Sequence, residues 1–598
     1  MKTSSHRPQR RSGGYALLLV LVFLGISTML LTTIMNWTSE TARLTDRQNE
    51  YYTTADAAEA ATEKILTHIS ADYLAGGEQA VINNLNAYKT TYPLAADNPY
   101  WGNYTFSNAS DGSQGVYVVR ATNWQYTVLN SQYSGLFGYQ ATYRILANAQ
   151  LTNNSRNGQL DAAVQQDVGL DSIPIFQFAI FYNQDLEMNP SPPMVVGGLV
   201  HANGNIYTVP STSLTFSNDV TASGFITNTF KPGDPMGSRG IANPVVIFDA
   251  AHDAYAKTLN LPVGGDNSSS NVNQILQLPP PGETNASPLA HARLYNQADM
   301  IIVISDTNMT VSSGPDLGTN INVANSAWSQ FLVDTNIIFN ARENSYVRTT
   351  QLDVGKFRTW VESAGNPITP KLSGKTAINI VYIADTRTRT ATISSTNSVT
   401  LQVTSITVPV EPGVELINGQ QLPKAGLTVA SPDPVYIVGD YNTTSDGANF
   451  SKLSNTTTFT RPAAVMGDSI NVLSTAWVDA NSLSPTRNAA DTTVNAALLA
   501  GIVPTGNGFY SGGVENFTRF LENWSGKNFY YNGSMVVLFN SQIAKAPWGG
   551  AGVYSPPSRH WAFDVNFLDV NKLPPATPQV LLIDRLAWLF QRPGYVPL

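Results

Sequence analysis

The feature that most constrains this chain is a long uncharged segment near its N-terminus. No charged residue occurs between Ser12 and Ser39, and the residues from Tyr15 to Met35 are predominantly apolar. About 20 apolar residues span a bilayer as a helix, whereas a cleaved secretory signal has only about 7–15, followed by a small-residue cleavage site. The segment is therefore too long for an ordinary cleaved signal, and residues 15–37 are predicted to form a transmembrane helix.

Basic residues before this segment set its predicted orientation. They are Lys2, Arg7, Arg10 and Arg11. Because cytoplasmic flanks carry the excess of Lys and Arg, the N-terminus is expected in the cytoplasm and everything after Trp37 outside.

Helical sequence continues beyond the predicted membrane span. Residues 38–74 contain no Gly or Pro and are rich in Ala, Glu, Leu and Arg. One helix is therefore predicted from Tyr15 to Leu74, about 90 Å long, with the pair Gly76-Gly77 as its stop. A soluble domain on an ordinary anchor does not need so long a rod, whereas a subunit packed by its helix into a filament does.

The N-terminal part of the chain resembles type IV pilin-like proteins. The resemblance lies in a short basic leader, a glycine just before an apolar helix that begins with an aromatic residue, and the segment DRQNEYYTTADAAEAATEKIL (46–66). Its DRQ and AAEA elements are most similar to PilX-type minor pilins and, more loosely, to GspK-type minor pseudopilins. The resemblance covers residues 7–75, about an eighth of the chain. An ordinary single-pass signal anchor is the alternative.

This resemblance implies a route of processing and assembly. A prepilin peptidase is expected to cut after Gly14, which removes residues 1–14 as the leader and leaves Tyr15 as the methylated first residue. The protein would then be a single-pass protein of the bacterial inner membrane, with its C-terminal part in the periplasm or outside the cell on a filament. Other pilin-like subunits are the implied partners, and Leu19, Phe23 and Ile26 are expected on the packing face of the helix.

One residue departs from the pattern of major pilins. These carry a glutamate at the fifth mature position, where this chain has Leu19. In the family that carboxylate pairs with the N-terminal amine of a neighbouring subunit, and a buried charge is costly unless it is paired. GspK-type tip subunits also lack the glutamate, so Leu19 points to a minor subunit that sits at the tip or initiates assembly.

The exported part is predicted to begin with an α+β domain. Strand patterns occur at 100–106, 115–124, 139–151 and 159–170. Alternation of Tyr143, Ile145 and Ala147 puts one strand face on a core, and the C-terminal half of the long helix is the expected partner. Residues 38–172 are therefore predicted as a pilin-like helix plus β-sheet domain.

Two internal similarities predict a mainly-β domain after it. GLVHANGNI (198–206) matches NDVTASGFI (218–226) at an offset of 20, and VYIVGDYN (435–442) matches AAVMGDSI (463–470) at an offset of 28. Repeats of this length favour a parallel β-helix, with a two-sheet sandwich as the rival. The predicted divisions are 173–231 for the first part, 232–415 for an irregular insertion with a helix over 244–261, 416–545 for the continuation, and 546–598 for a C-terminal cap. An amphipathic helix is also predicted over 514–524.

The residues offer little sign of catalysis. The chain has no cysteine, and its net charge of −8 comes with no basic block after the first eleven residues, which argues against nucleic-acid binding. Candidate carboxylates or calcium ligands, with one histidine, are Asp185, Glu187, His201, Asp219, Asp440, Asp446 and Asp468. Asp in Gly-Asp pairs more often accepts backbone amides in turns, and the six scattered histidines have no zinc spacing. No cofactor, metal or enzymatic activity is therefore expected.

Taken together, the sequence predicts a structural and assembly protein, a minor pilin-like subunit with a large β-rich head that acts in pilus or secretion-filament assembly or in adhesion. The alternative is a membrane-anchored polysaccharide-binding or polysaccharide-degrading β-helix enzyme. A surface polysaccharide is a candidate partner in either case.

Overall fold

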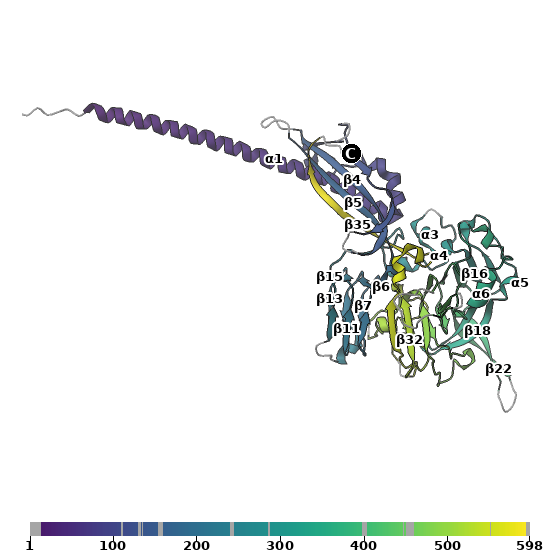
Figure 1. Cartoon of the computed structure of the whole chain (residues 1–598). Helices are drawn as coiled ribbons and strands as arrows, with labels where there is room; N and C mark the ends of the chain where they lie inside the picture. The colour runs from purple at the N-terminus through teal and green to yellow at the C-terminus, as the bar shows by residue number, and fades with distance from the viewer. Residues whose placement is uncertain are drawn as a thin grey trace, which may run out of the picture.

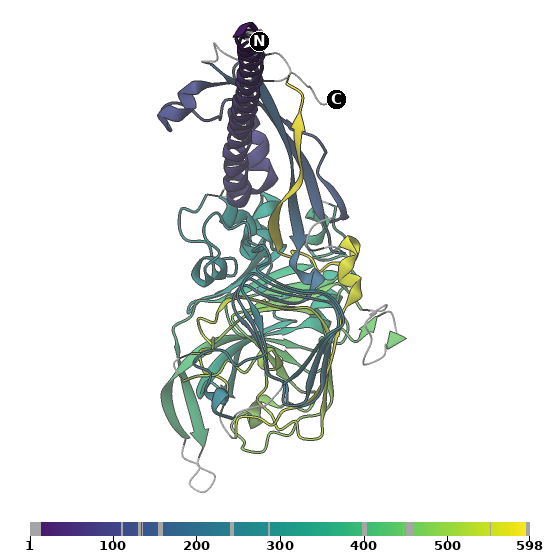
Figure 2. The same ribbon diagram turned by 90° about the vertical axis from the view of Figure 1, so that its left-hand side faces the viewer.

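The computed structural model divides the chain into a stem, a base and a head (Figures 1 and 2). It describes residues 13–593 except 109–111, 130–132, 134, 153–159, 240–243, 285–286, 373, 397–402, 446–447, 450–459, 507 and 550–551. We call residues 15–37 the stem. The base comprises residues 38–174 and 579–593, and the head is the part between them, residues 175–578. In Figure 1 the stem and the head project from opposite ends of the base.

The first element is the long helix α1 (Gly13–Tyr88). Its backbone leaves helical geometry at Gly76 (φ −146°, ψ 18°) and Gly77 (φ 65°, ψ −165°), so a second, shorter helical piece runs on to Tyr88. The backbone angles of Gly77 are open essentially to glycine alone. The predicted end of the rod at this glycine pair is thus confirmed.

The base packs α1 on one antiparallel sheet. Its strands are β1 (Tyr104–Ser107), β2 (Tyr117–Arg120), β3 (Gln125–Val128), β4 (Phe137–Leu151), β5 (Asp161–Pro174) and β35 (Gln579–Gln591). The helix buries a row of residues at spacings of three and four: Ala58, Ala61, Ile65, Ile69 and Tyr73. The predicted strand face of Tyr143, Ile145 and Ala147 is fully buried in the same core, which confirms the expected partner of the helix.

The head is inserted into the base between two neighbouring strands. Strand β35 pairs antiparallel with β5, and Gln579 lies opposite Pro174, the last residue before the head. Residues 546–598 were predicted as a C-terminal cap, but they form strands of the head and of the base instead. They supply β34 (Ser558–Phe563) to the head, and the apolar run of β35 then returns to the base, where Lys257 Nζ and Asp584 Oδ1 form an ion pair at 2.5 Å.

One long sheet runs the length of the head. In spatial order its strands are β15 (His252–Ala254), β12 (Val220–Ala222), β9 (Leu199–Ala202), β6 (Phe178–Tyr182), β33 (Met535–Asn540), β30 (Ala497–Ile502), β27 (Ala463–Gly467), β23 (Leu427–Ala430), β20 (Ile380–Asp385), β16 (Met300–Ile304) and β17 (Met309–Ser313). All adjacent pairs are parallel except β16 with β17. The chain enters the sheet at β6 and adds strands in one direction as far as β15. It then crosses to β16 near the other end of the sheet, and later strands are added toward β6 until β33 pairs with it.

The remaining head strands form shorter sheets. On one side these are β7 (Leu186–Met188), β10 (Ile206–Thr208) and β13 (Ile226–Thr227), and β8 (Met194–Val196), β11 (Ser213–Phe216) and β14 (Val245–Phe248). On the other they are β18 (Leu332–Asn340), β19 (Ser345–Asp353), β22 (Val403–Ile417), β24 (Val435–Val438), β28 (Ile470–Leu473) and β31 (Thr518–Arg519) with β21 (Thr390–Thr396), and β29 (Thr492–Asn495), β32 (Asn528–Gly533) and β34. A small hairpin joins β25 (Thr444–Ser445) to β26 (Ala448–Asn449). Short helices lie in the connections: α2 (Ser269–Asn273), α3 (Pro288–Ala292), α4 (Leu294–Gln297), α5 (Asn325–Trp328) and α6 (Val354–Val361).

Residues 232–415 are not an irregular insertion, contrary to prediction. We call one pass of the chain through the neighbouring sheets of the head a coil. The segment contributes β14 and β15, which extend the first coils, from β6 to β13, and it contributes β16, β20 and most of β22, which begin the later coils that lead back to β33. The helix predicted over 244–261 is absent from this described stretch: residues 245–248 and 252–254 form the strands β14 and β15, and the rest is irregular apart from bends and an isolated bridge at Asn260.

The helix predicted over 514–524 is also wrong. The segment forms a single 3₁₀ turn (Val514–Asn516) and then β31. Its apolar residues Val514, Phe517, Phe520, Leu521 and Trp524 are nevertheless all buried.

Candidate functional site: an apolar stem and a groove in the head

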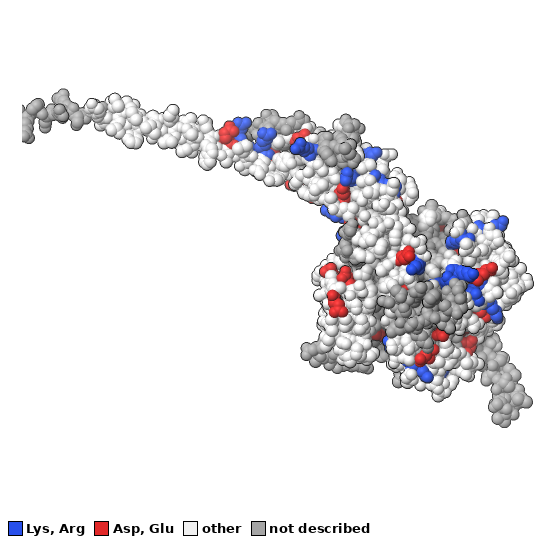
Figure 3. All heavy atoms as spheres, in the orientation of Figure 1, with Lys and Arg blue, Asp and Glu red and all other residues white. Residues whose placement is uncertain are grey.

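The stem carries the residues that the sequence assigned to filament packing. Tyr15 is 83% exposed, Leu19 55%, Phe23 62% and Ile26 50%. This part of α1 is long and apolar enough to cross a membrane, and none of its most apolar window is buried in the protein. Figure 3 shows it as a shaft without charged side chains that extends from the base.

The predicted processing residues lie at the end of this shaft. Gly14 and Tyr15 belong to the first turns of α1. The orienting cations Lys2, Arg7, Arg10 and Arg11 lie outside the described residues.

The C-terminal part of α1 contacts the sheet of the base through polar side chains as well as through its row of buried apolar residues. Tyr73 donates a hydrogen bond to the Asp171 carbonyl oxygen at 2.7 Å, and Gln166 Nε2 donates to Glu63 Oε1 at 2.7 Å. Arg585 of β35 forms an ion pair with Glu63 at 2.6 Å. The apolar residues 15–37 are therefore exposed, whereas the C-terminal part of the same helix is held by contacts with β5 and β35.

The predicted head carboxylates mostly serve the backbone. Asp185 Oδ1 accepts from the Asn205 amide at 2.8 Å, Asp219 Oδ1 from the Ala251 amide at 3.1 Å, and Asp440 Oδ1 from the Thr493 amide at 2.8 Å. These amides lie 20, 32 and 53 residues further along the chain, so the carboxylates join separate passes of the chain rather than closing the local turns that the sequence predicted. Asp446 lies outside the described residues.

His201 is a core residue. It is fully buried, and its ring nitrogens lie 2.8 Å from Thr221 Oγ1 and 2.9 Å from Asn203 Oδ1. Burial lowers the pKa of His201 to about 4, so the ring is neutral at pH 7. Within the described residues no three His, Asp or Glu side chains are grouped so as to hold a metal ion.

Glu187 does belong to a larger polar site. It accepts hydrogen bonds from Thr505 Oγ1 at 2.8 Å and from Ser511 Oγ at 3.3 Å, and burial raises its pKa to about 6. Its charge also helps to raise the pKa of Glu515, which burial brings to about 7. Glu515 was not a sequence candidate, because Glu187 and Glu515 lie near opposite ends of the head sequence and no local pattern connects them.

Glu515 lies in the wall of a large groove. The groove has a volume of about 1020 Å³. It opens where the beginning of the head sequence meets its end. One side is formed by residues within 189–195 and 209–211, and the other by residues within 510–516, 548–549 and 553–561. Here the edge strands β8 and β34 approach within 8 Å between Cα atoms but are not paired with each other. We call this the seam groove.

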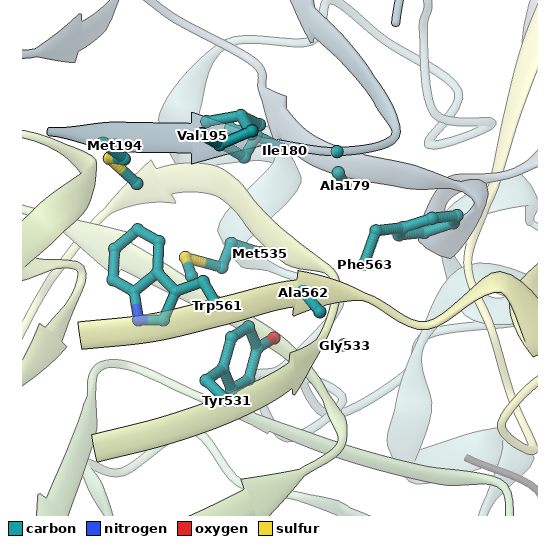
Figure 4. Close-up of a pocket in the computed structure, with 12 residues that line it drawn as sticks. Ala179, Ile180, Met194, Val195, Tyr531, Gly533, Met535, Trp561, Ala562 and Phe563 are labelled. Atoms are coloured by element: carbon teal, nitrogen blue, oxygen red, sulfur yellow. The ribbon is translucent and has the colours of Figure 1, made fainter. Parts of the chain in front are cut away.

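Aromatic side chains and prolines both line the groove, and several of the aromatic side chains contact one another. Trp548 packs edge-on against Tyr510, with ring centroids 5.4 Å apart, and its Nε1 donates to Tyr554 Oη at 2.8 Å. Tyr554 and Arg559 both donate to Asn516 Oδ1. Figure 4 shows an adjoining part of the seam, where the indole of Trp561 lies beside Met194 and Met535.

Comparison with known proteins gives little beyond this geometry. No protein-family model matches the chain, and no curated protein matches it in sequence. Among solved structures, the competence-associated pilin ComZ from Thermus thermophilus aligns with 90% of this chain and 98% of its own, at 9% identity and a TM-score of 0.30. A TM-score this low does not establish a shared fold.

Proposed function

We propose that this protein is a structural subunit of a type IV pilus or a related secretion filament. In this proposal the stem anchors it in the bacterial inner membrane and the head is carried in the periplasm or outside the cell. The N-terminus faces the cytoplasm, and the leader ends at Gly14. Its partners are a prepilin peptidase, which methylates Tyr15 after cleavage, and other pilin-like subunits.

The observation that carries the proposal is the division of α1 into two unlike halves. Residues 15–37 expose a continuous apolar surface, residues 38–53 remain largely exposed, and the helix packs on the sheet of the base from Thr54 onward. An apolar surface of this size is unfavourable in water and is expected to be covered by lipid or by other helices. A rigid base keeps the stem free for either environment, which is what transfer from a membrane to a filament requires.

The form of the head supports a minor rather than a major subunit. It hangs from the ends of β5 and β35, at the end of the base away from the stem. A head that spans residues 175–578 is hard to repeat at every step of a filament, and Leu19 supplies no carboxylate to pair with a neighbour's amine. Both features favour a PilX-like or GspK-like subunit at the tip or at initiation. We further infer that the stacked parallel strands make the head a parallel β-helix.

The test is the mature N-terminus of protein recovered from membranes of a host with an active prepilin peptidase. We expect the chain to begin at methylated Tyr15, and Gly14→Leu to block cleavage because the peptidase needs a small residue there. Gly13→Ala, one residue earlier, is the matched control and should be cleaved normally. A wild-type chain that still begins at Met1, or one cut after Trp37 and released from the membrane, would contradict the proposal.

A further inference from the structure

The seam groove has the composition of a ligand site rather than of a packing defect. Its volume lies at the upper end of the roughly 300–1,000 Å³ typical of small-molecule sites. It arises where the chain closes the head on itself, so its two walls come from the beginning and the end of the head sequence. The groove stays open because the edge strands β8 and β34 on its two sides are not hydrogen-bonded to each other.

Polar atoms in its walls lack side-chain partners. Among the described residues, Trp561 Nε1 and Arg559 Nε have no acceptor, although both are buried. Glu515 is 7% exposed and accepts no hydrogen bond from a described side chain, although the backbone amides of Glu515 and Asn189 and the charge of Arg559 act to lower the pKa of its carboxyl group. Buried polar groups are normally satisfied, so two unpaired donors in one groove, beside a carboxylate that no side chain serves, favour a ligand that offers hydrogen-bond acceptors.

We propose that the seam groove binds a neutral polysaccharide chain. A sugar hydroxyl both donates and accepts, so it can serve Glu515 on one side and Arg559 or Trp561 on the other. The flat faces of Trp548 and Tyr554 suit the apolar faces of sugar rings. Arg342 and Arg559 share the lining with Glu515, so the groove has no single sign of charge to attract a polyanion.

Two further observations favour this occupant. The network from Trp548 through Tyr554 to Asn516 and Arg559 fixes the aromatic rings before binding, which lowers the entropic cost of association. An extended peptide inserted as a strand between β8 and β34 would need a separation of about 9.6 Å, twice the strand spacing, whereas some Cα atoms of these strands lie within 8 Å of each other. The proposal does not depend on the pilin-like role.

The test is calorimetric titration of the full-length protein in detergent. The probes are three neutral hexasaccharides (cellohexaose, chitohexaose and maltohexaose) and the anionic hexagalacturonate. We expect at least one neutral hexasaccharide to bind, and Trp548→Ala to raise its Kd about tenfold or more because a stacking face is lost. Trp588→Ala, on exposed β35 of the base, is the matched control and should leave Kd unchanged.

A second variant protects the test against misfolding. Ser211 is exposed at the rim, so Ser211→Tyr should fold normally and still obstruct the groove. Binding that disappears in this variant supports the proposal. The proposal is overturned if no neutral hexasaccharide binds up to about 10 mM, if hexagalacturonate alone binds, or if Ser211→Tyr and Trp548→Ala bind as the wild type does.

Discussion

Asp468 illustrates what a buried carboxylate does in the head. Its oxygens accept hydrogen bonds from three successive backbone amides, those of Gln542, Ile543 and Ala544, at 2.5, 3.1 and 2.8 Å. Burial raises the pKa of Asp468, and these amides lower it. The residue thus holds the segment after β33 against the turn after β27, and this structural role needs no ligand.

Glu415, on β22, gives a pH-dependent prediction. It is fully buried, its Oε2 accepts hydrogen bonds from Asn336, Thr349 and Gln351, and burial together with the charge of Asp479 raises its pKa to about 7. The folded state therefore binds this proton more tightly than the unfolded chain, where a glutamate has a pKa near 4.3. The stability that Glu415 contributes is complete at low pH and is lost as pH rises from about 4.5 through 7.

We expect the free energy of unfolding to fall between pH 5 and pH 8, with Glu415 responsible for about 2 kcal/mol. The measurement is urea unfolding at the two pH values. Glu415→Gln should reduce the fall by about 2 kcal/mol, because glutamine does not titrate, and should leave the part that Glu187 and Glu515 contribute. Glu411→Gln on the same strand should keep the full dependence. An equal fall in wild type and Glu415→Gln would show that other groups are responsible.

At the scale of elements, the sequence predicted which residues of a strand face a core, but it predicted the pairing between strands only in part. The 20-residue repeat placed Val200 opposite Val220 and Ile206 opposite Ile226, and both registers are confirmed. The 28-residue offset was wrong, because Val435 pairs with Ile470 in β28 rather than with Ala463. Gly-Asp lies at the end of β24 and of β27, but the two turns do not occupy equivalent positions. The similar sequence therefore does not mark two paired strands.

Burial was easier to predict than secondary structure. The spacing of Val514, Phe517, Leu521 and Trp524 suits one face of a helix, and all four are buried, but neighbouring coils impose an extended backbone instead. The seam groove could not be predicted at all, since Glu515 and Glu187 meet only through the closure of the whole head.

Strand β35 is the element on which the base should depend. A chain that ends at Leu582 keeps Val580, Leu581 and Leu582 buried but loses the partner of residues 163–170 and the Arg585–Glu63 ion pair. We expect hydrogen exchange to accelerate in β5 over 163–170, because its amides on that side lose their acceptors, while β27 and β30 in the head keep their protection. Faster exchange in those head strands, or unchanged exchange in β5, would contradict this division.

At the scale of the whole molecule, the long sheet of the head is completed only when β33, from the end of the head sequence, pairs with β6 from its beginning. Strand β6 enters first, yet its partner β33 comes from the far end of the head sequence, where Ile180 lies opposite Met535 and Ser534 Oγ donates to the Phe178 carbonyl oxygen at 2.5 Å. Until β33 is in place, the first coils end in an unpaired edge and an open core. In the parallel β-helix proposed above, a stack this short is marginal, because each coil would bury its apolar side chains only against its neighbours.

We therefore expect the first coils to be unstable without the last ones. A chain that ends at Asn495 lacks β30 and β33, so limited proteolysis should cut it within residues 178–254, as Ile180 and Val200 lose the coil that covers them. A chain that ends at Pro578 contains the whole head and is the matched control, in which the same segment should resist cleavage. If residues 178–254 resist protease equally in both chains, the first coils fold alone, and the seam is then a docking of two finished halves rather than the step that completes one core.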